Sequence, residues 1–269
     1  MAAVGFVGVG TMGKALAINL LQAGHDVMVH DLRPGPVQEL AAMGARAARS
    51  GADIGRHSEI VEVVVPADDG GIELAVLGPD GVLPHANPGA TIIIHSTCHP
   101  ETVKRIDREA RPKGVDVLDA TMVGGQQNVV SHTQTFMVGG DARVLERCRP
   151  VLAASASNIF HMGGVGMGAA TKAAEQIITV ISVLAACEGF ALAEKAGVDI
   201  EVFQQLLAAS KEEGRFLAHF NQFRSAKRPD PRPFYRGLQP ILKLAFDLDV
   251  QVPGAALAQQ TIPWAVGEH

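Results

Sequence analysis

The chain has 269 residues, of which 47% are hydrophobic and only 4% aromatic, so aliphatic side chains must build its interior. A formal net charge of −5 and a pI near 6.0 give no basic surface of the kind that nucleic-acid binding requires. The longest apolar stretch, Ile177–Cys187, is too short to span a bilayer. Three scattered cysteines suggest no disulfide framework and the amino terminus shows no basic leader, so we expect a cytoplasmic protein.

A strand, a glycine-rich turn and a helix are predicted at the start of the chain. An apolar run over Ala2–Val7 leads into Gly8, Gly10 and Gly13, and a helical pattern follows over Lys14–Ala23. In such a turn the first glycine allows a sharp bend, the second lets a pyrophosphate approach the backbone, and the third lets the helix pack closely on the strand. The start of the helix offers N–H groups and a positive dipole end to phosphates. The pattern predicts a dinucleotide-binding unit, with a tight turn that binds nothing as the alternative.

An acidic residue follows this unit. The next apolar run, Val27–Asp31, ends in a carboxylate that can accept hydrogen bonds from a ribose diol. Asp31 repels a 2′-phosphate and thereby favours NAD, whereas Arg33 can pair with that phosphate. We therefore expect NAD as the preferred cofactor, with NADP as the alternative.

Short β-branched runs alternate with helical patterns up to about residue 160. Strands are predicted over Ile60–Val65, Thr91–His95, Val115–Asp119 and Thr135–Gly140, with turns rich in glycine and proline between them. This alternation is typical of βαβ units on a mostly parallel sheet. We therefore expect an α/β fold whose residues 1–160 form a Rossmann-type doubly wound sheet that binds NAD(P).

Helical patterns alone follow residue 160. The stretch Ala169–Ala196 is apolar nearly all round, so it must be buried, and it is longer than one small domain can cover. Further helices are predicted over Glu201–Ser210, Gly214–Arg224 and Leu238–Leu248. We expect residues 161–269 to form an all-helical substrate and dimerisation domain. Its long bridging helix would pack against a second subunit in a homodimer or homotetramer.

The segment Arg215–Arg236 mixes basic and aromatic residues. Pro229, Pro231 and Pro233 favour an irregular, solvated loop over this segment. A lid over an anionic substrate is the alternative, and a nucleic-acid surface is the least expected.

Polar or flexible residues follow two of the predicted strands. Ser96 and Thr97 come directly after one strand, and Gly124 and Gly125 follow another. The carboxyl ends of parallel strands line the ligand crevice of a doubly wound sheet, and glycine N–H groups can receive an anion such as a carboxylate. Ser96 and Thr97 can instead merely cap the helix predicted near Pro100.

A lysine lies near the start of the long helix. The glycine-rich run Gly163–Gly168 opens that helix, and Lys172 lies on its first turns. An amine in a mostly apolar helix is costly to bury unless it has a task, and lysine is a recurring general acid. A lysine on the helix surface with no such task is the alternative.

Taken jointly, these elements resemble the β-hydroxyacid dehydrogenase family, which includes 3-hydroxyisobutyrate dehydrogenases and lies in the 6-phosphogluconate dehydrogenase superfamily. The glycine turn with Met12 resembles the family's Gly-x-Gly-x-Met-Gly, and Ser96-Thr97-x-x-Pro100 resembles its Ser-Thr-x-x-Pro element. Asp119-Ala120 with Gly124-Gly125 resembles its Asp-Ala-Pro-Val-Ser-Gly-Gly, and Gly166-x-Gly168-x-x-x-Lys172 resembles its catalytic-lysine motif. The resemblance covers nearly the whole chain.

This resemblance implies an NAD(P)-dependent dehydrogenase or reductase that moves a hydride between the nicotinamide and a β-hydroxyacid, or a related alcohol or aldehyde. It implies Lys172 as the general acid/base and no metal. The implied substrate-binding residues are Ser96, Thr97, Val123, Gly124, Gly125 and Gln176. The implied cofactor-binding residues are Gly8, Gly10, Thr11, Met12, Gly13, Asp31, Arg33, Pro66 and Thr97.

Three departures from the family pattern concern the substrate side. Val123 stands where serine is usual, Glu175 and Gln176 replace two asparagines, and Arg236-Gly237 replaces Lys-Asp. A carboxylate at Glu175 favours the charged form of Lys172 and opposes a negatively charged substrate. We therefore expect a substrate that is bulkier or less acidic than 3-hydroxyisobutyrate.

Three alternatives remain open at this point. An imine reductase would use the same fold, although such relatives generally lack a lysine at the position of Lys172. A dinucleotide-binding module without catalysis would explain the altered pocket but would have no need of that lysine. His95, Cys98 and His99 suggest a metal or a Cys–His nucleophile, but their spacing fits no zinc pattern.

Overall fold

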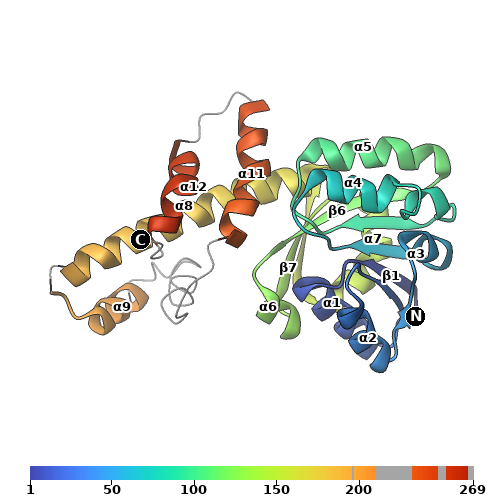
Figure 1. Cartoon of the computed structure of the whole chain (residues 1–269), viewed down its shortest axis with the longest axis horizontal. Coiled ribbons are helices and arrows are strands. Elements are labelled where there is room, and N and C mark those ends of the chain that lie inside the picture. The colour runs from blue at the N-terminus through green and yellow to red at the C-terminus, as the bar shows by residue number, and fades with distance from the viewer. Residues whose placement is uncertain (196, 210–231, 248–252, 266–269) are drawn as a thin grey trace. The chain divides into compact units, whose positions relative to one another are not determined.

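The computed structural model describes residues 1–195, 197–209, 232–247 and 253–265 (Figure 1). The chain divides into two compact units, Met1–Lys172 and Ala173–His269. The division falls within one helix, α8, which spans Met167–Lys195.

The first unit is built on an eight-stranded sheet in the order β3-β2-β1-β4-β5-β6-β7-β8. All neighbouring strands are parallel except β6 and β7. This confirms the Rossmann-type doubly wound sheet. The strands are β1 Ala3–Val7, β2 Asp26–His30, β3 Arg46–Ala47, β4 Ile60–Val63, β5 Thr91–Ile94, β6 Asp116–Val123, β7 Gln134–Gly139 and β8 Ala156–Gly163.

Helices cover both faces of this sheet. One face is covered by α1 Thr11–Gln22, α2 Pro34–Ala42, α6 Gln126–Val130 and α7 Ala142–Ala153. The other is covered by α3 Gly51–His57, α4 Asp69–Leu77 and α5 Pro100–Ala110, with the short 3-10 turns η1 Leu83–His85 and η2 Arg111–Lys113 nearby. Figure 1 shows α4 and α5 together on the face opposite α1 and α2.

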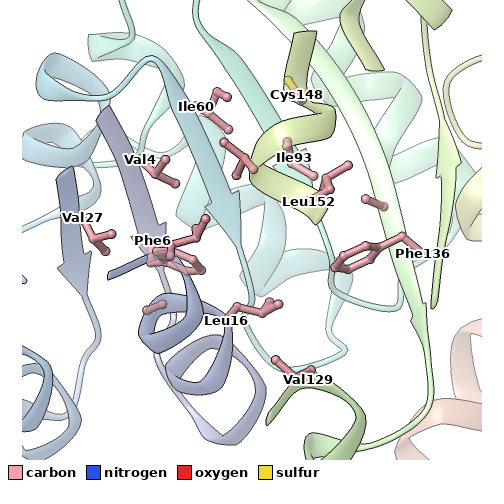
Figure 2. Packing of buried hydrophobic residues seen from close by; sticks show 14 of the residues in the cluster. Val4, Phe6, Leu16, Val27, Ile60, Ile93, Val129, Phe136, Cys148 and Leu152 are labelled. Atoms are coloured by element: carbon pink, nitrogen blue, oxygen red, sulfur yellow. The ribbon is translucent and has the colours of Figure 1, made fainter. Parts of the chain in front are cut away.

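Successive side chains of a strand point to opposite faces of the sheet, so a strand can contribute to the hydrophobic clusters on both faces. Ile92 and Ile94 of β5 point into the cluster under α4 and α5, whereas Ile93 points into the cluster under α1 and α7. All three side chains are fully buried, as expected for a strand with helices on both faces. Figure 2 shows the second of these clusters, in which Ile93 lies near Leu152 and Phe136.

Three strands differ from the sequence-based prediction, and one of them is the two-residue β3, where no strand is predicted. No strand is predicted over residues 156–163, where β8 adds a parallel edge to β7. This segment has few β-branched residues and its side chains are mostly exposed, so it carries little of the usual strand pattern. The strand expected to end at Asp119 continues to Val123, because antiparallel pairing of Val123 with Thr135 extends β6 beyond its parallel neighbour.

The second unit is helical over its described residues. It contains most of α8, followed by α9 Ile200–Ala209, α11 Arg232–Asp247 and α12 Pro253–Ala265. Its core includes Val180 and Leu184 of α8, Leu238 of α11 and Ala258 of α12. No helix within the described ranges is long and apolar enough to cross a membrane.

The irregular loop predicted up to Arg236 is wrong for its last residues. Helix α11 begins at Arg232, so Pro233 lies in its first turn, where proline fits a helix well. The rest of that segment and the helix predicted over Gly214–Arg224 lie outside the described residues.

Candidate active site

The turn after β1 depends on two of its glycines for steric reasons. Gly8 has a φ of 91°, and a side chain there would overlap the Val64 carbonyl oxygen. A side chain at Gly13 would overlap the Gly8 carbonyl oxygen and approach Val64 to 3.2 Å. The turn therefore brings the start of α1 directly against β1 and the residue that follows β4.

Gly10 has a different environment. It is the N-cap residue of α1 and provides no side-chain cap. Among the described residues, the one atom that a methyl group here would meet within 4 Å, beyond its chain neighbours, is the Arg33 Nη2 at 3.4 Å. Thr11 beside it is exposed, Met12 is half-buried, and the first turn of α1 carries no acidic residue. An open helix N-terminus of this kind fits a pyrophosphate.

Asp31 and Arg33 form a bidentate ion pair beside this turn. Asp31 Oδ1 accepts from the Arg33 Nε at 3.1 Å, and Oδ2 accepts from the Arg33 Nη2 at 3.2 Å. The backbone N–H groups of Val9 and Arg33 donate to the same carboxylate at 2.9 Å each. Burial alone would raise the pKa of Asp31, but the hydrogen bonds from Arg33 and Val9 outweigh it and lower that pKa below its ordinary value. The carboxylate thus stays ionised and available to a ribose diol once the guanidinium moves.

Ser96 connects two loops at the carboxyl end of the sheet. Its Oγ donates to the Val65 carbonyl at 2.8 Å and accepts from the Val65 N–H at 3.0 Å. The hydroxyl is buried and engaged with the backbone next to Pro66, which is exposed. Thr97 is half-buried. The helix α5 that follows takes its side-chain cap from His99, so Ser96 is not that cap.

The loop after β6 carries three of the predicted substrate residues. Val123 is the last residue of β6, Gly124 has a φ of 113°, and both Gly124 and Gly125 are exposed. The Gly125 N–H donates to the Asn128 Oδ1 at 3.1 Å. This N–H already has an acceptor, so it would have to leave Asn128 to bind a substrate anion.

The start of α8 is fixed to β6 by a buried carboxylate. Asp119 Oδ1 accepts from the Gly166 N–H at 2.8 Å, and its Oδ2 accepts from the Ala169 N–H at 2.7 Å. Thr121, two residues along β6, donates from its Oγ1 to the Gly168 carbonyl at 2.9 Å. Burial raises the pKa of Asp119 to about 6, although the backbone hydrogen bonds oppose that rise.

Lys172 lies on α8, three residues beyond Ala169. Its side chain is only 8% exposed, so the helix-surface alternative is wrong. Gln176 lies one turn further along α8, in the second unit, and is half-buried. The structure brings Lys172 into the first unit together with the cofactor turn and the loops after β5 and β6.

A buried Glu62–His95 pair lies at the ends of β4 and β5. The His95 ring nitrogen Nδ1 lies 2.7 Å from the Ala120 carbonyl, and His95 Nε2 lies 3.5 Å from Glu62 Oε2. A carbonyl only accepts, so Nδ1 carries a proton. Both Nε2 and Oε2 are buried, and neither atom has a hydrogen-bond partner among the described residues.

Neither nucleophile nor metal chemistry finds support near His95. Burial raises the pKa of the Cys98 thiol far above its ordinary range, which opposes thiolate formation. No group of three or more His, Cys, Asp or Glu side chains suited to a metal ion exists in the part of the chain that the structure describes.

Asp119, Asn128 and Glu62 are the residues near the site whose roles sequence reasoning missed. Asp119 was visible only as part of the Asp-Ala motif, and its partners lie 47 and 50 residues further along the chain. Asn128 and Glu62 stand in none of the family motifs quoted above.

Two family models match consecutive parts of the chain. The model of the NAD binding domain of 6-phosphogluconate dehydrogenase matches residues 3–164. The model described as NAD-binding of NADP-dependent 3-hydroxyisobutyrate dehydrogenase matches residues 166–268. With the doubly wound sheet and the glycine turn, these matches define an NAD(P)-dependent oxidoreductase.

Known proteins resemble the chain over nearly its full length. An NAD-dependent L-serine dehydrogenase and a 3-hydroxyisobutyrate dehydrogenase, both from Pseudomonas aeruginosa, are each 33% identical over 98% of this chain and 88% of their own length. A 3-hydroxyisobutyrate dehydrogenase from Mycobacterium tuberculosis, solved with L-serine, superposes with a TM-score of 0.84 at 25% identity, covering 100% of this chain and 95% of that chain. The chain belongs to the 3-hydroxyisobutyrate dehydrogenase-like family of β-hydroxyacid dehydrogenases, and it acts on hydroxyl groups or the carbonyls they form.

Imine reductases share the architecture more distantly. One from Streptomyces aurantiacus has a TM-score of 0.71 at 16% identity, covering 96% of this chain and 92% of that chain. A likeness at this level concerns the fold alone.

Proposed function

We propose that this chain interconverts a small hydroxy acid, or a related alcohol, and its carbonyl compound, with Lys172 as the general acid/base. The observation that carries the proposal is the burial of Lys172 on the helix whose start is bound to Asp119 of β6. A buried amine is costly, so its presence there is best explained by a task. The membership in a family of dehydrogenases supports the same assignment.

The residues of the cofactor turn fit a dinucleotide. Gly10 leaves room above the N-terminus of α1, Gly8 and Gly13 hold the turn, and Asp31 presents an ionised carboxylate. The proposed cofactor set also includes Thr11, Met12, Arg33, Pro66 and Thr97. NAD(P) supplies the hydride chemistry when bound.

The protein's own contribution is then orientation and proton transfer. In reduction, Lys172 Nζ gives its proton to the carbonyl oxygen, and in oxidation it takes the hydroxyl proton. Thr97, Val123, Gly124, Gly125 and Gln176 are the proposed substrate contacts. Ser96 belongs to this set through the loop it holds, because its hydroxyl is engaged with Val65.

The substrate class follows from what replaces the usual contacts. Val123 offers no hydroxyl donor to a carboxylate, and Gly125 already donates to Asn128. With few hydrogen-bond donors for a carboxylate, the site favours a substrate that is bulkier or less acidic than 3-hydroxyisobutyrate. Efficient turnover of 3-hydroxyisobutyrate would contradict this part of the proposal.

The proposal is tested by following NADH oxidation with glyoxylate, succinic semialdehyde and benzaldehyde, and NAD⁺ reduction with L-serine and 3-hydroxyisobutyrate. We expect turnover with at least one compound and a fall in kcat of about 10²–10⁴-fold in Lys172→Ala, the range for a general acid/base. Lys14→Ala, on the surface of α1 and paired with Glu39, is the matched lysine control and should retain kcat. Full turnover by Lys172→Ala would refute the assignment of Lys172. Cofactor binding without any turnover would favour an imine substrate or a non-catalytic role.

We also propose a cytoplasmic homodimer or homotetramer with a functional division near residue 160. Large apolar side chains of the second unit are exposed in the single chain, including Phe246 at 85% and Ile178 at 69%. Such surfaces commonly mark subunit contacts. Light scattering of the purified protein tests the assembly, and a monomer would contradict it.

A further inference from the structure

The residue before helix α8 has no side chain that could cap the helix. Gly166 has a φ of 89° and precedes Met167, the first helical residue. Because it is a glycine, it offers no side-chain oxygen to the N–H groups of the first turn. Asp119 supplies both missing acceptors from another element. One of its oxygens binds the N–H of Gly166 and the other binds the N–H of Ala169.

Close backbone approach accompanies this clamp. A side chain at Gly168 would come within 2.6 Å of the Met137 carbonyl oxygen, and one at Gly139 would come within 2.8 Å of the Gly164 carbonyl oxygen. Thr121 adds a third tie through its bond to the Gly168 carbonyl. These contacts hold the first turn of α8 against β6 and β7. They fix both its position along the helix axis and its rotation about that axis.

The clamp uses a charge that the site does not favour. Asp119 is 1% exposed, and its burial outweighs the backbone hydrogen bonds that oppose it, so the pKa of its carboxyl is raised to about 6. A neutral side chain of the same shape would avoid that desolvation penalty. It would not, however, offer two acceptors to two N–H donors. The carboxylate is thus costly to bury, but it alone accepts both N–H groups and so fixes the placement of the helix start.

We propose that Asp119 is a positioning residue for this reaction, a proposal that rests on the proposed function of Lys172. By fixing the first turn of α8 on β6, it sets where the side chain of Lys172 lies, less than one turn beyond Ala169. Asp119 itself makes no contact with substrate or cofactor in this role. A misplacement of a reacting group by about 1 Å can cost about 10²-fold in rate, so a clamp of this kind has a measurable effect on kcat.

The test is Asp119→Asn, with Asp141→Asn as the matched control. Asp141 caps α7 in a similar way, because its Oδ1 accepts from the N–H groups of Arg143 and Val144 at 2.7 and 3.3 Å. With succinic semialdehyde, or whichever aldehyde of the panel is turned over fastest, we expect Asp119→Asn to lower kcat about 10–100-fold. We expect the substrate KM and the NADH Kd to change less than about threefold, and the Tm to shift by less than about 4 °C. Asp141→Asn should retain kcat.

A second readout needs no substrate. Amide hydrogen exchange at Gly166 and Ala169 should accelerate in Asp119→Asn and stay slow in Asp141→Asn and in Lys172→Ala. Should Asp119→Asn fail to fold, Thr121→Val removes the third tie without changing the shape of the side chain. It should lower kcat several-fold at constant NADH Kd.

The outcomes separate the two proposals. A kcat within twofold of wild type in Asp119→Asn, while Lys172→Ala is inactive, overturns the positioning role alone. A parallel loss of kcat, NADH binding and Tm in Asp119→Asn also overturns it, because that pattern is a structural defect. Full activity of Lys172→Ala overturns the proposed function, and the exchange rates at Gly166 and Ala169 then still report whether the clamp exists.

Discussion

Two glycine-rich turns of this chain each combine a helix N-terminus with an aspartate, but they do so in opposite ways. The turn Gly8–Gly13 and the run Gly163–Gly168 each follow a strand and open a helix, and an aspartate accepts backbone N–H groups beside each. At the first, Gly10 is open and Asp31 is paired with Arg33, so its pKa is lowered. At the second, Asp119 is inside the fold, caps the helix, and has a raised pKa. One turn leaves the helix N-terminus open for an anion, and the other closes it with the protein's own carboxylate.

The largest effect should come from closing the first turn with a methyl group at two different glycines. Gly13→Ala forces an overlap with the Gly8 carbonyl and should cost about 3 kcal/mol of unfolding free energy. Among the residues that the structure describes, Gly10→Ala meets only the Arg33 guanidinium, so its cost should stay below about 1 kcal/mol. It should nevertheless weaken NADH binding at least about tenfold, because the pyrophosphate loses its approach to the backbone. Urea unfolding and NADH titration of the two variants check this, and equal stability losses would contradict it.

An effect of intermediate size is expected in the pH dependence of the folding stability, where Asp119 at the second turn should differ from Asp31 at the first. The pKa of Asp119 rises from 3.8 to about 6 on folding, so between these values the folded state binds a proton that the unfolded chain does not. Lowering the pH from about 8 to about 5 should therefore stabilise wild type relative to Asp119→Asn by about 1.4 kcal/mol. Urea unfolding of both proteins at the two pH values measures the difference. A wild type that instead loses stability relative to the variant would mean that Asp119 is stabilised as a carboxylate, as Asp31 is.

The smallest effect concerns the ion pair at the first turn. The Arg33 guanidinium occupies acceptor sites on Asp31 and lies 3.4 Å from a methyl group built at Gly10, so a bound dinucleotide must displace it. Arg33→Ala should tighten NADH binding about two- to threefold and weaken NADPH binding, since the variant cannot pair with a 2′-phosphate. Fluorescence titration with both cofactors tests this, with Lys14→Ala as the surface control. Tighter NADPH than NADH binding in wild type would contradict the NAD preference itself.

Local patterns account for what could be predicted. The spacing of Gly8, Gly10 and Gly13 reflects steric limits within one turn, and the apolar runs at Ile60 and Thr91 reflect strands buried on both faces. The buried lysine was expected because it stands in an apolar helix. Strand β8 was missed because an exposed edge strand needs no apolar alternation. The engagement of Ser96 with Val65 and of Gly125 with Asn128 was missed because a motif does not say which partner a polar group takes.

The sequence by itself determined the doubly wound sheet, the open glycine turn with Asp31 and the family, because each rests on residues close together in the chain or on their order along it. Only the tertiary structure decided that Asp119 closes the start of α8. Its hydrogen-bond partners lie 47 and 50 residues away, and its burial depends on β6, β7 and α8 meeting. Whether a carboxylate near a helix N-terminus is a ligand site or a cap is a matter of solvent access and of neighbours, and both are properties of the folded chain.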